Sequence, residues 1–390
     1  MMNLAILGST GSIGETTLNI IRKNKNNFKI KLLSTNTNFK KIYHQAIEFN
    51  VKNIVINNKK INNYWKMKFN EKNINIFHDF DNLTKLFKKK LNYVMNAISG
   101  IDGLEPTLKI IKHTNKIAIA NKESIICGWN LINNQLKKNR TTFIPVDSEH
   151  FSIHKLIDKD KNYKIKHIIL TASGGPFLNK KINYKNVKIK DALKHPNWKM
   201  GKKISIDSAT MMNKVFEVIE AKKIFNLNID QIKILINPNS YLHAIIIFKN
   251  GTIKILAHET KMDIPIFNSI YENTSQREYE TKNLNLKKMN SLCLAEPNIK
   301  KFPSLKILKK ISKKDTLFET ILITVNDELV KKFLNGEIKF ENISIILSRI
   351  INFKKFKKYC IVKPKSIEQI FNVRNLAKRY VYDYVKKYNI

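Results

Sequence analysis

The segment His195–Ala221 concentrates polar side chains that could do chemistry together. It contains an imidazole, a hydroxyl, an amide, an ammonium and a carboxylate, on His195, Ser208, Asn213, Lys214 and Glu217. On a helix, Asn213 and Lys214 lie four and three residues before Glu217, so the three share one face. A donor-rich face with one carboxylate suits a phosphorylated, hydroxylated ligand held beside a metal ion.

A second acidic group follows the apolar run Phe143–Val146. In an extended segment, residues i and i+2 point the same way, so Asp147 and Glu149 could aim two carboxylates at one point. Such like charges repel unless a cation lies between them, and oxygen ligands without cysteine favour Mg²⁺ or Mn²⁺. The structural alternative is a helix start, with Asp147 as the cap and Glu149 in the first turn.

Three further segments could contact a ligand, and each has a structural alternative. Ser173 with Gly174 and Gly175 could form an anion cradle or a simple tight turn. The segment Asn121–Ser124 follows a predicted strand, where parallel sheets bind ligands, but it could also be an ordinary helix start. His195 and Trp198 could belong to a lid over the substrate or to a core pair.

The glycine-rich segment Gly8–Gly14 follows the first predicted strand and opens a predicted helix. Glycines there let the backbone approach a pyrophosphate, although the GxxGxxG spacing also fits a structural turn. After the second predicted strand, the segment Ser34–Asn38 carries no acid, and Lys40 and Lys41 follow it. An acid at this place favours NAD, so its absence favours NADP.

The elements that would position these groups form an α/β protein. Residues 1–147 alternate apolar runs with helical patterns, which predicts a parallel, Rossmann-like sheet that binds NADPH. Residues 148–275 predict an α+β domain with a helix over Ala209–Phe225. Residues 276–312 read as a connection, and residues 313–390 as a C-terminal helical bundle. The predicted strands are Leu4–Leu7, Ile30–Leu33, Ile54–Ile56, Tyr93–Ala97, Ile117–Ala120 and Phe143–Val146, then Ile165–Leu170, Ile232–Ile236, Leu242–Phe248 and Thr252–Leu256.

Composition disfavours several other classes of protein. The net charge of +40 comes from lysines spread over the whole chain without a nucleic-acid-binding motif, so we expect no nucleic-acid partner. The sequence contains no run of eighteen apolar residues, so we expect no membrane helix. The N-terminus is typical of a buried strand rather than a signal peptide. The three cysteines are far apart, which favours a reducing cytoplasm over a disulfide framework or a zinc site.

Together these segments resemble the 1-deoxy-D-xylulose 5-phosphate reductoisomerase family of the non-mevalonate isoprenoid pathway. The resemblance rests on GSTGSIG at 8–14, ANKES at 120–124, PVDSEH at 145–150, SGGPF at 173–177, HPNWKMG at 195–201 and ISIDSATMMNK followed by Glu217. The C-terminal third fits more loosely, through Val325–Glu328. The family implies a homodimer that rearranges and reduces 1-deoxy-D-xylulose 5-phosphate, a small phosphosugar, with NADPH and Mg²⁺ or Mn²⁺. It also implies that residues 148–275 form the catalytic and dimerisation domain, with a flexible lid near 195–201.

The resemblance also implies residue roles. The implied metal ligands are Asp147, Glu149 and Glu217. The implied substrate or catalytic residues are Lys122, Ser148, Glu149, Ser173, His195, Ser208, Asn213, Lys214 and Glu217, with Trp198 on the lid. The implied cofactor contacts are Thr10, Gly11, Ser12, Ile13, Asn36, Asn38, Asn121, Glu123 and Gly201.

The chain departs from the family pattern at a few positions. A common Gly-Lys-Asn is Asn36-Thr37-Asn38 here, which leaves the contact to the NADP 2′-phosphate open between Lys40 and Lys41. Val215-Phe216 replaces a usual Gly-Leu, and Asn237 stands where histidine is usual. The competing hypotheses are an NADP-dependent oxidoreductase without a metal, a basic nucleic-acid-binding protein and an inactive homologue.

Overall fold

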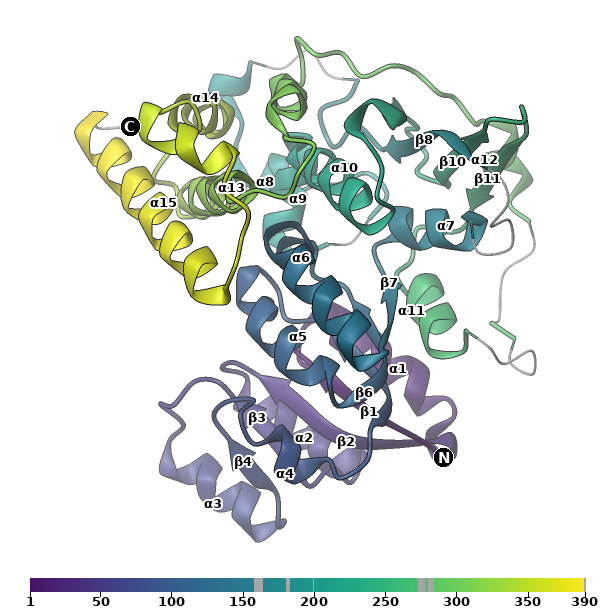
Figure 1. Ribbon diagram of the computed structural model, residues 1–390, viewed down its shortest axis with the longest axis vertical. Helices are drawn as coiled ribbons and strands as arrows, with labels where there is room; N and C mark the ends of the chain where they lie inside the picture. Colours follow the sequence, from purple (N-terminus) through teal and green to yellow (C-terminus); the bar gives the residue numbers. More distant parts are fainter. Residues whose placement is uncertain (158–163, 180–182, 199, 273–277, 280–283, 389–390) are drawn as a thin grey trace. The chain divides into compact units, whose positions relative to one another are not determined.

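The computed structural model describes residues 1–157, 164–179, 183–198, 200–272, 278–279 and 284–388. The chain forms two compact units, coloured by sequence in Figure 1. The first comprises Met1–Ser124, Asn130–Phe151 and Met262–Glu280, and the second Ile125–Trp129, Ser152–Lys261 and Thr281–Ile390. The predicted boundary at 275/276 and Lys199 of the predicted lid lie outside the described residues.

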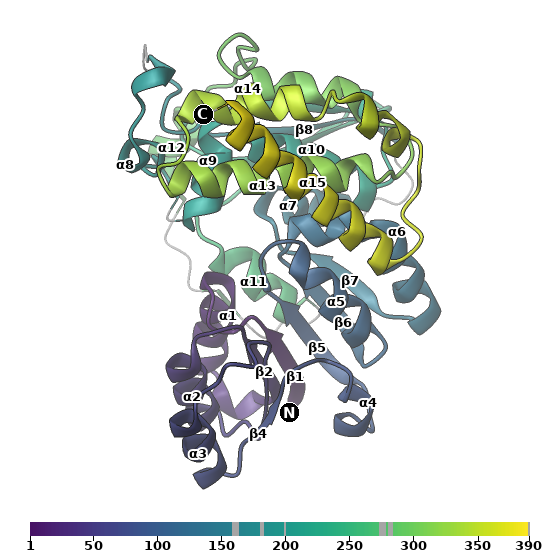
Figure 2. The same ribbon diagram turned by 90° about the vertical axis from the view of Figure 1, so that its left-hand side faces the viewer.

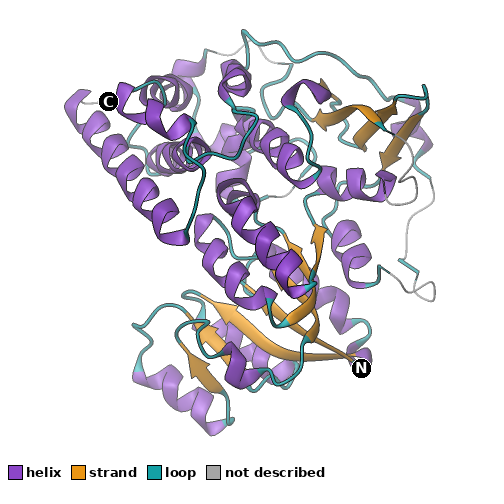
Figure 3. Ribbon diagram, viewed as in Figure 1, coloured by secondary structure: helices purple, strands orange, loops and turns teal. Residues whose placement is uncertain are grey.

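The first unit is built on a parallel seven-stranded sheet, which confirms the α/β prediction (Figure 3). The strand order is β4-β3-β2-β1-β5-β6-β7. Leu4, Ile6 and Leu7 on β1 are fully buried, because helices cover both faces of such a sheet. The strands are β1 Met2–Leu7, β2 Phe28–Thr35, β3 Asn53–Ile56, β4 Asn75–Phe77, β5 Leu91–Asn96, β6 Thr114–Ile119 and β7 Thr142–Pro145.

Helices flank this sheet, with α1 and α2 on one side and α5 on the other (Figure 2). The α-helices with residues in this unit are α1 Ser12–Arg22, α2 Phe39–Glu48, α3 Asn63–Glu71, α4 Leu83–Leu86, α5 Leu104–Ile111, α6 Lys122–Asn139, α7 Ser148–Ile157 and α11 Asp263–Ile270, with short 3₁₀ helices at Lys25–Asn27 and Ile101–Gly103. Although α11 is distant in sequence, Ile266 and Ile270 join the core of this unit, and Ser269 Oγ lies 2.7 Å from Tyr93 Oη.

The strand order reverses at β1, whose neighbours are β2 and β5. In open α/β sheets, ligands bind at the carboxyl ends of the strands beside such a reversal. The segments that leave this edge are Gly8–Gly11 after β1, Asn36–Asn38 after β2, Asn121 after β6 and Asp147 after β7. The topology therefore gathers the polar segments that the sequence singled out in this unit.

The second unit has its own sheet, in the order β11-β10-β8-β9. Its strands are β8 Ile165–Ala172, β9 Ile232–Ile236, β10 Leu242–Phe248 and β11 Ile253–Ala257. One face packs against the central helix α10, where Val218 and Ala221 meet Ile168, Leu170 and Ile246. This sheet confirms the predicted α+β region.

The helices of the second unit differ in one respect from the prediction. The predicted helix over Ala209–Phe225 is interrupted, because Thr210 Oγ1 bonds the carbonyls of the preceding turn and Met211 has a left-handed φ of 61°. Ser208 and Asn213 therefore lie on different helices. The α-helices are α8 Ile189–Ala192, α9 Lys202–Ala209, α10 Met212–Ile224, α12 Leu286–Asn290, α13 Phe318–Leu334, α14 Phe340–Ile350 and α15 Ile367–Tyr388, with 3₁₀ helices at Tyr184–Asn186, Ile229–Gln231, Pro303–Lys310 and Lys354–Cys360.

The predicted helices of the C-terminal region form as expected. Gly336 follows α13 with a φ of 79°, and Ser366 Oγ accepts a hydrogen bond from the amide of Gln369 at the start of α15. Across the described residues, no helix is both long and apolar enough to cross a membrane.

We predict that the three-residue spacing of the glycines serves packing at Gly14. A Cβ on Gly14 would lie 2.5 Å from the Gly8 oxygen and the Ser9 Cα, whereas a Cβ on Gly11 would meet only the Gly8 oxygen at 3.5 Å. Gly14→Ala should therefore lower the free energy of unfolding by about 2 kcal/mol or more, and Gly11→Ala by about 1 kcal/mol or less. Chemical denaturation measures both, and equal losses would contradict the packing role.

Candidate active site

The glycine turn after β1 is tied to the end of β2. The Gly8 amide donates to Ser34 Oγ over 2.8 Å, and the hydroxyls of Thr10 and Thr35 lie 2.7 Å apart. Gly8 has a φ of 78°, and a Cβ there would lie 2.8 Å from the Ala97 carbonyl. The predicted cofactor residues Thr10, Gly11, Ser12 and Ile13 form this turn and the start of α1. The first-turn amides of α1 thus point to a place for an anion.

The other predicted cofactor residues of the first unit lie at helix starts or next to one. Asn36 is exposed, and Asn38 Oδ1 caps α2 by accepting from the Lys41 amide over 3.1 Å. Asn121 caps α6 by accepting from the Ser124 amide over 2.9 Å. Its own amide donates to the carbonyls of Ile98 and Gly100. The segment Asn121–Ser124 is therefore the start of a helix, as one of its two interpretations predicted, and Glu123 lies in the first turn.

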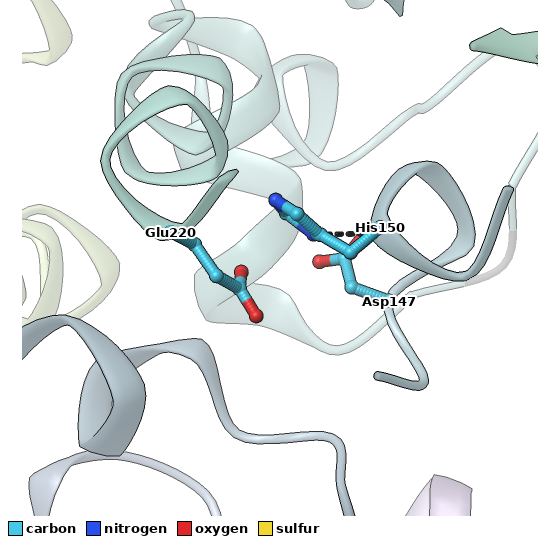
Figure 4. Close-up of side chains that lie close together, drawn as sticks. All are labelled: Asp147, His150 and Glu220. Atoms are coloured by element: carbon cyan, nitrogen blue, oxygen red, sulfur yellow. Dashed lines mark ion pairs between the residues drawn. The ribbon is translucent and has the colours of Figure 1, made fainter. Parts of the chain in front are cut away.

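A buried charge cluster lies at the carboxyl ends of β6 and β7. Lys122 Nζ is 2.7 Å from Asp147 Oδ2. His150 Nδ1 lies 3.8 Å from Asp147 Oδ1 (Figure 4). Burial by itself would raise the pKa of Asp147, but the Lys122 ammonium and His150 together hold that pKa well below its usual value. Asp147 is therefore an anion that the protein is built to keep charged.

The carboxylates of Asp147 and Glu149 do converge, although not in the predicted way. Oxygens of the two side chains lie within 4.8 Å of each other. The helix α7 begins at Ser148, and the Phe151 amide bonds the Asp147 carbonyl over 2.8 Å, so the segment is a helix start rather than an extended run. Ser148 Oγ donates to Glu149 Oε2 over 2.5 Å. Asp147 and Glu149 therefore converge within a helical turn, not because residues i and i+2 of a strand point the same way.

In the second unit, the predicted residues Ser173 and His195 are hydrogen-bonded. His195 Nδ1 accepts from the amides of Asn197 and Trp198, over 3.2 and 3.0 Å, so the neutral ring carries its proton on Nε2. That nitrogen lies 2.9 Å from Ser173 Oγ, which also accepts from the Gly175 amide over 3.1 Å. With two donors already bonded to it, Ser173 Oγ has its own hydrogen left for an anionic ligand.

The glycine pair beside Ser173 brings this turn against Ser208. Gly175 has a φ of 69°, and a Cβ there would lie 2.8 Å from the Ser208 carbonyl oxygen. Any side chain at this position would push the turn away from the end of α9. The glycine pair therefore lets the segment after Ser173 lie against the end of α9, which carries Ser208.

The helix α10 presents three of the predicted residues from its first two turns. Lys214 and Glu217 form an ion pair and are 4% and 2% exposed, and Asn213 donates to the Glu217 carboxylate. Lys214 Nζ also donates to the Thr171 carbonyl over 2.5 Å. The prediction that Asn213, Lys214 and Glu217 share one face of a helix is confirmed. Because an unpaired buried charge is costly, removing either Lys214 or Glu217 would destabilise the fold.

Residues to which the sequence analysis gave no role fix the end of α9. Asp207 accepts from Asn326 Nδ2 of α13 over 2.7 Å, and Lys203 bridges Asp207 and Asp327 over 2.9 and 3.0 Å. Asn326 and Asp327 lie within Val325–Glu328, the segment through which the C-terminal third resembles the family, and that match was the available signal. These contacts position Ser208, the residue next to Asp207.

The remaining predicted residues lie before α9. Trp198 packs edge-on against His243, with 6.1 Å between ring centroids, and Asn197 Nδ2 donates to the Pro238 carbonyl over 2.6 Å. Gly201 is exposed and caps α9. Asn237, which replaces the family histidine, is buried and donates to the Cys293 carbonyl over 3.1 Å.

We predict a pH dependence of stability from His195. Burial lowers its pKa to about 4, below the 6.5 of an unperturbed histidine. The unfolded chain thus takes up a proton between pH 6.5 and 4 that the folded chain does not, so stability falls as pH decreases through this window. The variant His195→Gln should show a shallower fall in denaturation experiments, and the exposed His44→Gln an unchanged one. An unchanged slope in His195→Gln would contradict the assignment.

Three family descriptions match the chain. They are 1-deoxy-D-xylulose 5-phosphate reductoisomerase over residues 4–128, its C-terminal domain over 143–225, and the DXP reductoisomerase C-terminal domain over 258–380. A 1-deoxy-D-xylulose 5-phosphate reductoisomerase from Pelagibacter ubique (strain HTCC1062) is 54% identical over 381 residues, which cover 96% of this chain and 97% of that protein.

Solved structures agree with these matches. A DOX-P reductoisomerase in complex with NADPH, fosmidomycin and magnesium has a TM-score of 0.90 at 30% identity and covers 99% of this chain and 98% of that one. The enzyme from Zymomonas mobilis in complex with NADPH has a TM-score of 0.86 at 30% identity and covers 97% and 98%. This chain belongs to the 1-deoxy-D-xylulose 5-phosphate reductoisomerase family.

Proposed function

We propose that this protein converts 1-deoxy-D-xylulose 5-phosphate to 2-C-methyl-D-erythritol 4-phosphate, with NADPH and a divalent metal, in isoprenoid precursor biosynthesis. The single observation that carries the proposal is the partly buried pair Asp147 and Glu149 beside Lys122, at the edge of the sheet that also presents the glycine turn. An NADP-dependent oxidoreductase without a metal would leave this pair of acids without a role. A nucleic-acid-binding protein would leave it equally unexplained.

We assign the metal to Asp147, Glu149 and Glu217. The donor set consists of carboxylate oxygens, which suits Mg²⁺ or Mn²⁺ rather than a metal that prefers sulfur. The convergence of the first two side chains, both partly buried, supports this assignment. When bound, the metal polarises the substrate carbonyl and hydroxyl as a Lewis acid, and NADPH supplies the hydride.

The substrate residues hold the phosphosugar at both ends. Ser173, Ser208 and Asn213 bind the phosphate, and the free hydroxyl hydrogen of Ser173 donates to a phosphate oxygen. His195 is neutral near pH 7 and keeps that hydroxyl oriented. Lys122, Ser148 and Lys214 orient the hydroxyls near the reacting carbons, and Trp198 covers the phosphate as part of the lid.

The proposed cofactor contacts are those that the resemblance implies: Thr10, Gly11, Ser12, Ile13, Asn36, Asn38, Asn121, Glu123 and Gly201. The bonds that join the glycine turn to β2 support this placement, because they fix the turn that leads into α1, and the first turn of a helix can bind a pyrophosphate. The chemistry of a reducing cofactor and the spacing of the three cysteines agree with a cytoplasmic location.

We predict that the metal requirement depends on Glu217 and not on Glu220, which is also buried on α10, three residues further on (Figure 4). In an assay that follows NADPH absorbance with 1-deoxy-D-xylulose 5-phosphate and Mn²⁺, Glu217→Gln should lower kcat by about 100-fold or more. Glu220→Gln should retain the wild-type dependence on Mn²⁺. The opposite pattern would remove Glu217 from the metal site, and a wild-type protein without metal-dependent turnover would refute the proposed function.

We further propose that the protein is a homodimer formed through the sheet of the second unit. On β11, an edge strand, Ile253 and Ile255 are 59% and 55% exposed and lie opposite Ile247 and Ile245 of β10. An exposed apolar edge strand pairs readily with another chain. A second copy would cover these exposed isoleucines and form hydrogen bonds with the backbone groups at the edge of the sheet.

We predict that Ile255→Lys shifts the protein from dimer to monomer in sedimentation experiments at micromolar concentration. Ile345→Lys on α14 is the matched control, because Ile345 is also exposed, at 44%, but lies on a helix. This variant should sediment like the wild type. A monomeric wild type, or a dimer that tolerates Ile255→Lys, would contradict the proposed interface.

A further inference from the structure

We infer that Lys41 is the residue that recognises the 2′-phosphate of NADPH in this chain. The inference rests on the NADPH dependence proposed above and settles the choice between two neighbouring lysines. In dinucleotide-binding sheets, the adenosine ribose lies against the end of the second strand. From Ser34 to Ile47 the chain has no acidic residue that could bind an unphosphorylated ribose, and its cations there are Lys40 and Lys41.

The geometry separates the two lysines. Lys41 Nζ donates to the Thr10 carbonyl over 3.2 Å, and the Thr10 hydroxyl in turn lies 2.7 Å from that of Thr35, at the end of β2. The ammonium therefore sits between the pyrophosphate turn and the ribose end of β2. Lys40 is exposed on the preceding position of α2. Lys41 is thus the cation that the protein already directs to the place where a 2′-phosphate must lie.

An anion already accompanies this ammonium. Glu15 Oε1 lies 3.3 Å from Lys41 Nζ, and the two side chains are 29% and 39% exposed. Glu15 is held from the other side by Gln45 Nε2. A half-exposed ion pair of this kind is weakly held, so a phosphate dianion can replace the carboxylate as the partner of Lys41.

The test is a titration of the protein with NADPH and, separately, with NADH, followed by nicotinamide fluorescence without substrate or turnover. Lys41→Met should weaken NADPH binding by about 10- to 100-fold and leave NADH binding within about threefold, because only NADPH carries the 2′-phosphate. Lys40→Met, the matched control, should leave both affinities within about threefold. Lys41→Arg should retain the preference for NADPH, since it keeps the positive charge.

An unchanged ratio of the two affinities in Lys41→Met would overturn the inference, as would loss of the preference in Lys40→Met alone. Either result would leave the proposed function intact, provided that the wild type still prefers NADPH. A wild type that binds neither reduced cofactor would contradict both. Thermal unfolding of each variant checks that altered binding does not come from loss of the fold.

Discussion

Two carboxylates that are partly buried close together lose hydration and repel each other, so a nearby cation supplied by the fold stabilises them. Asp147 and Glu149 have such a cation in Lys122, whose ammonium lies 2.7 Å from Asp147. The parallel pairing of β6 with β7 sets the carboxyl ends of both strands at one edge, and α6 and α7 begin there. The charged cluster thus depends on strand order as much as on the residues themselves.

In the second unit, helices hold a buried pair of opposite charges. The ion pair of Lys214 with Glu217 is almost fully buried on α10, and Lys214 is held further by the Thr171 carbonyl at the end of β8. The neighbouring α9 is fixed to α13 through Asp207 and Asn326. Buried charges of this kind are costly if left unpaired, which accounts for the many polar contacts around the substrate residues.

Sequence reasoning located most of the fold, because buried parallel strands such as Leu4–Leu7 have an unbroken apolar pattern. It did not find β4, whose residues at Asn75–Phe77 are exposed or half-buried and lack such a pattern. It also missed the break at Met211, since hydrophobic periodicity does not report a left-handed residue. The proton on His195 Nε2 is set by two backbone amides and could be assigned only from coordinates. The proposed metal ligands, by contrast, came from residue types and spacing together with the family resemblance.

The most direct test of the account is to grow crystals with Mn²⁺ and locate the ion by its anomalous scattering. We predict one strong peak, with carboxylate oxygens of Asp147, Glu149 and Glu217 within about 2.0 to 2.3 Å of it. The same peak should disappear from crystals of Glu217→Gln grown under identical conditions. A peak bound instead by His150 or Glu220, or no peak near Asp147, would contradict the central claim.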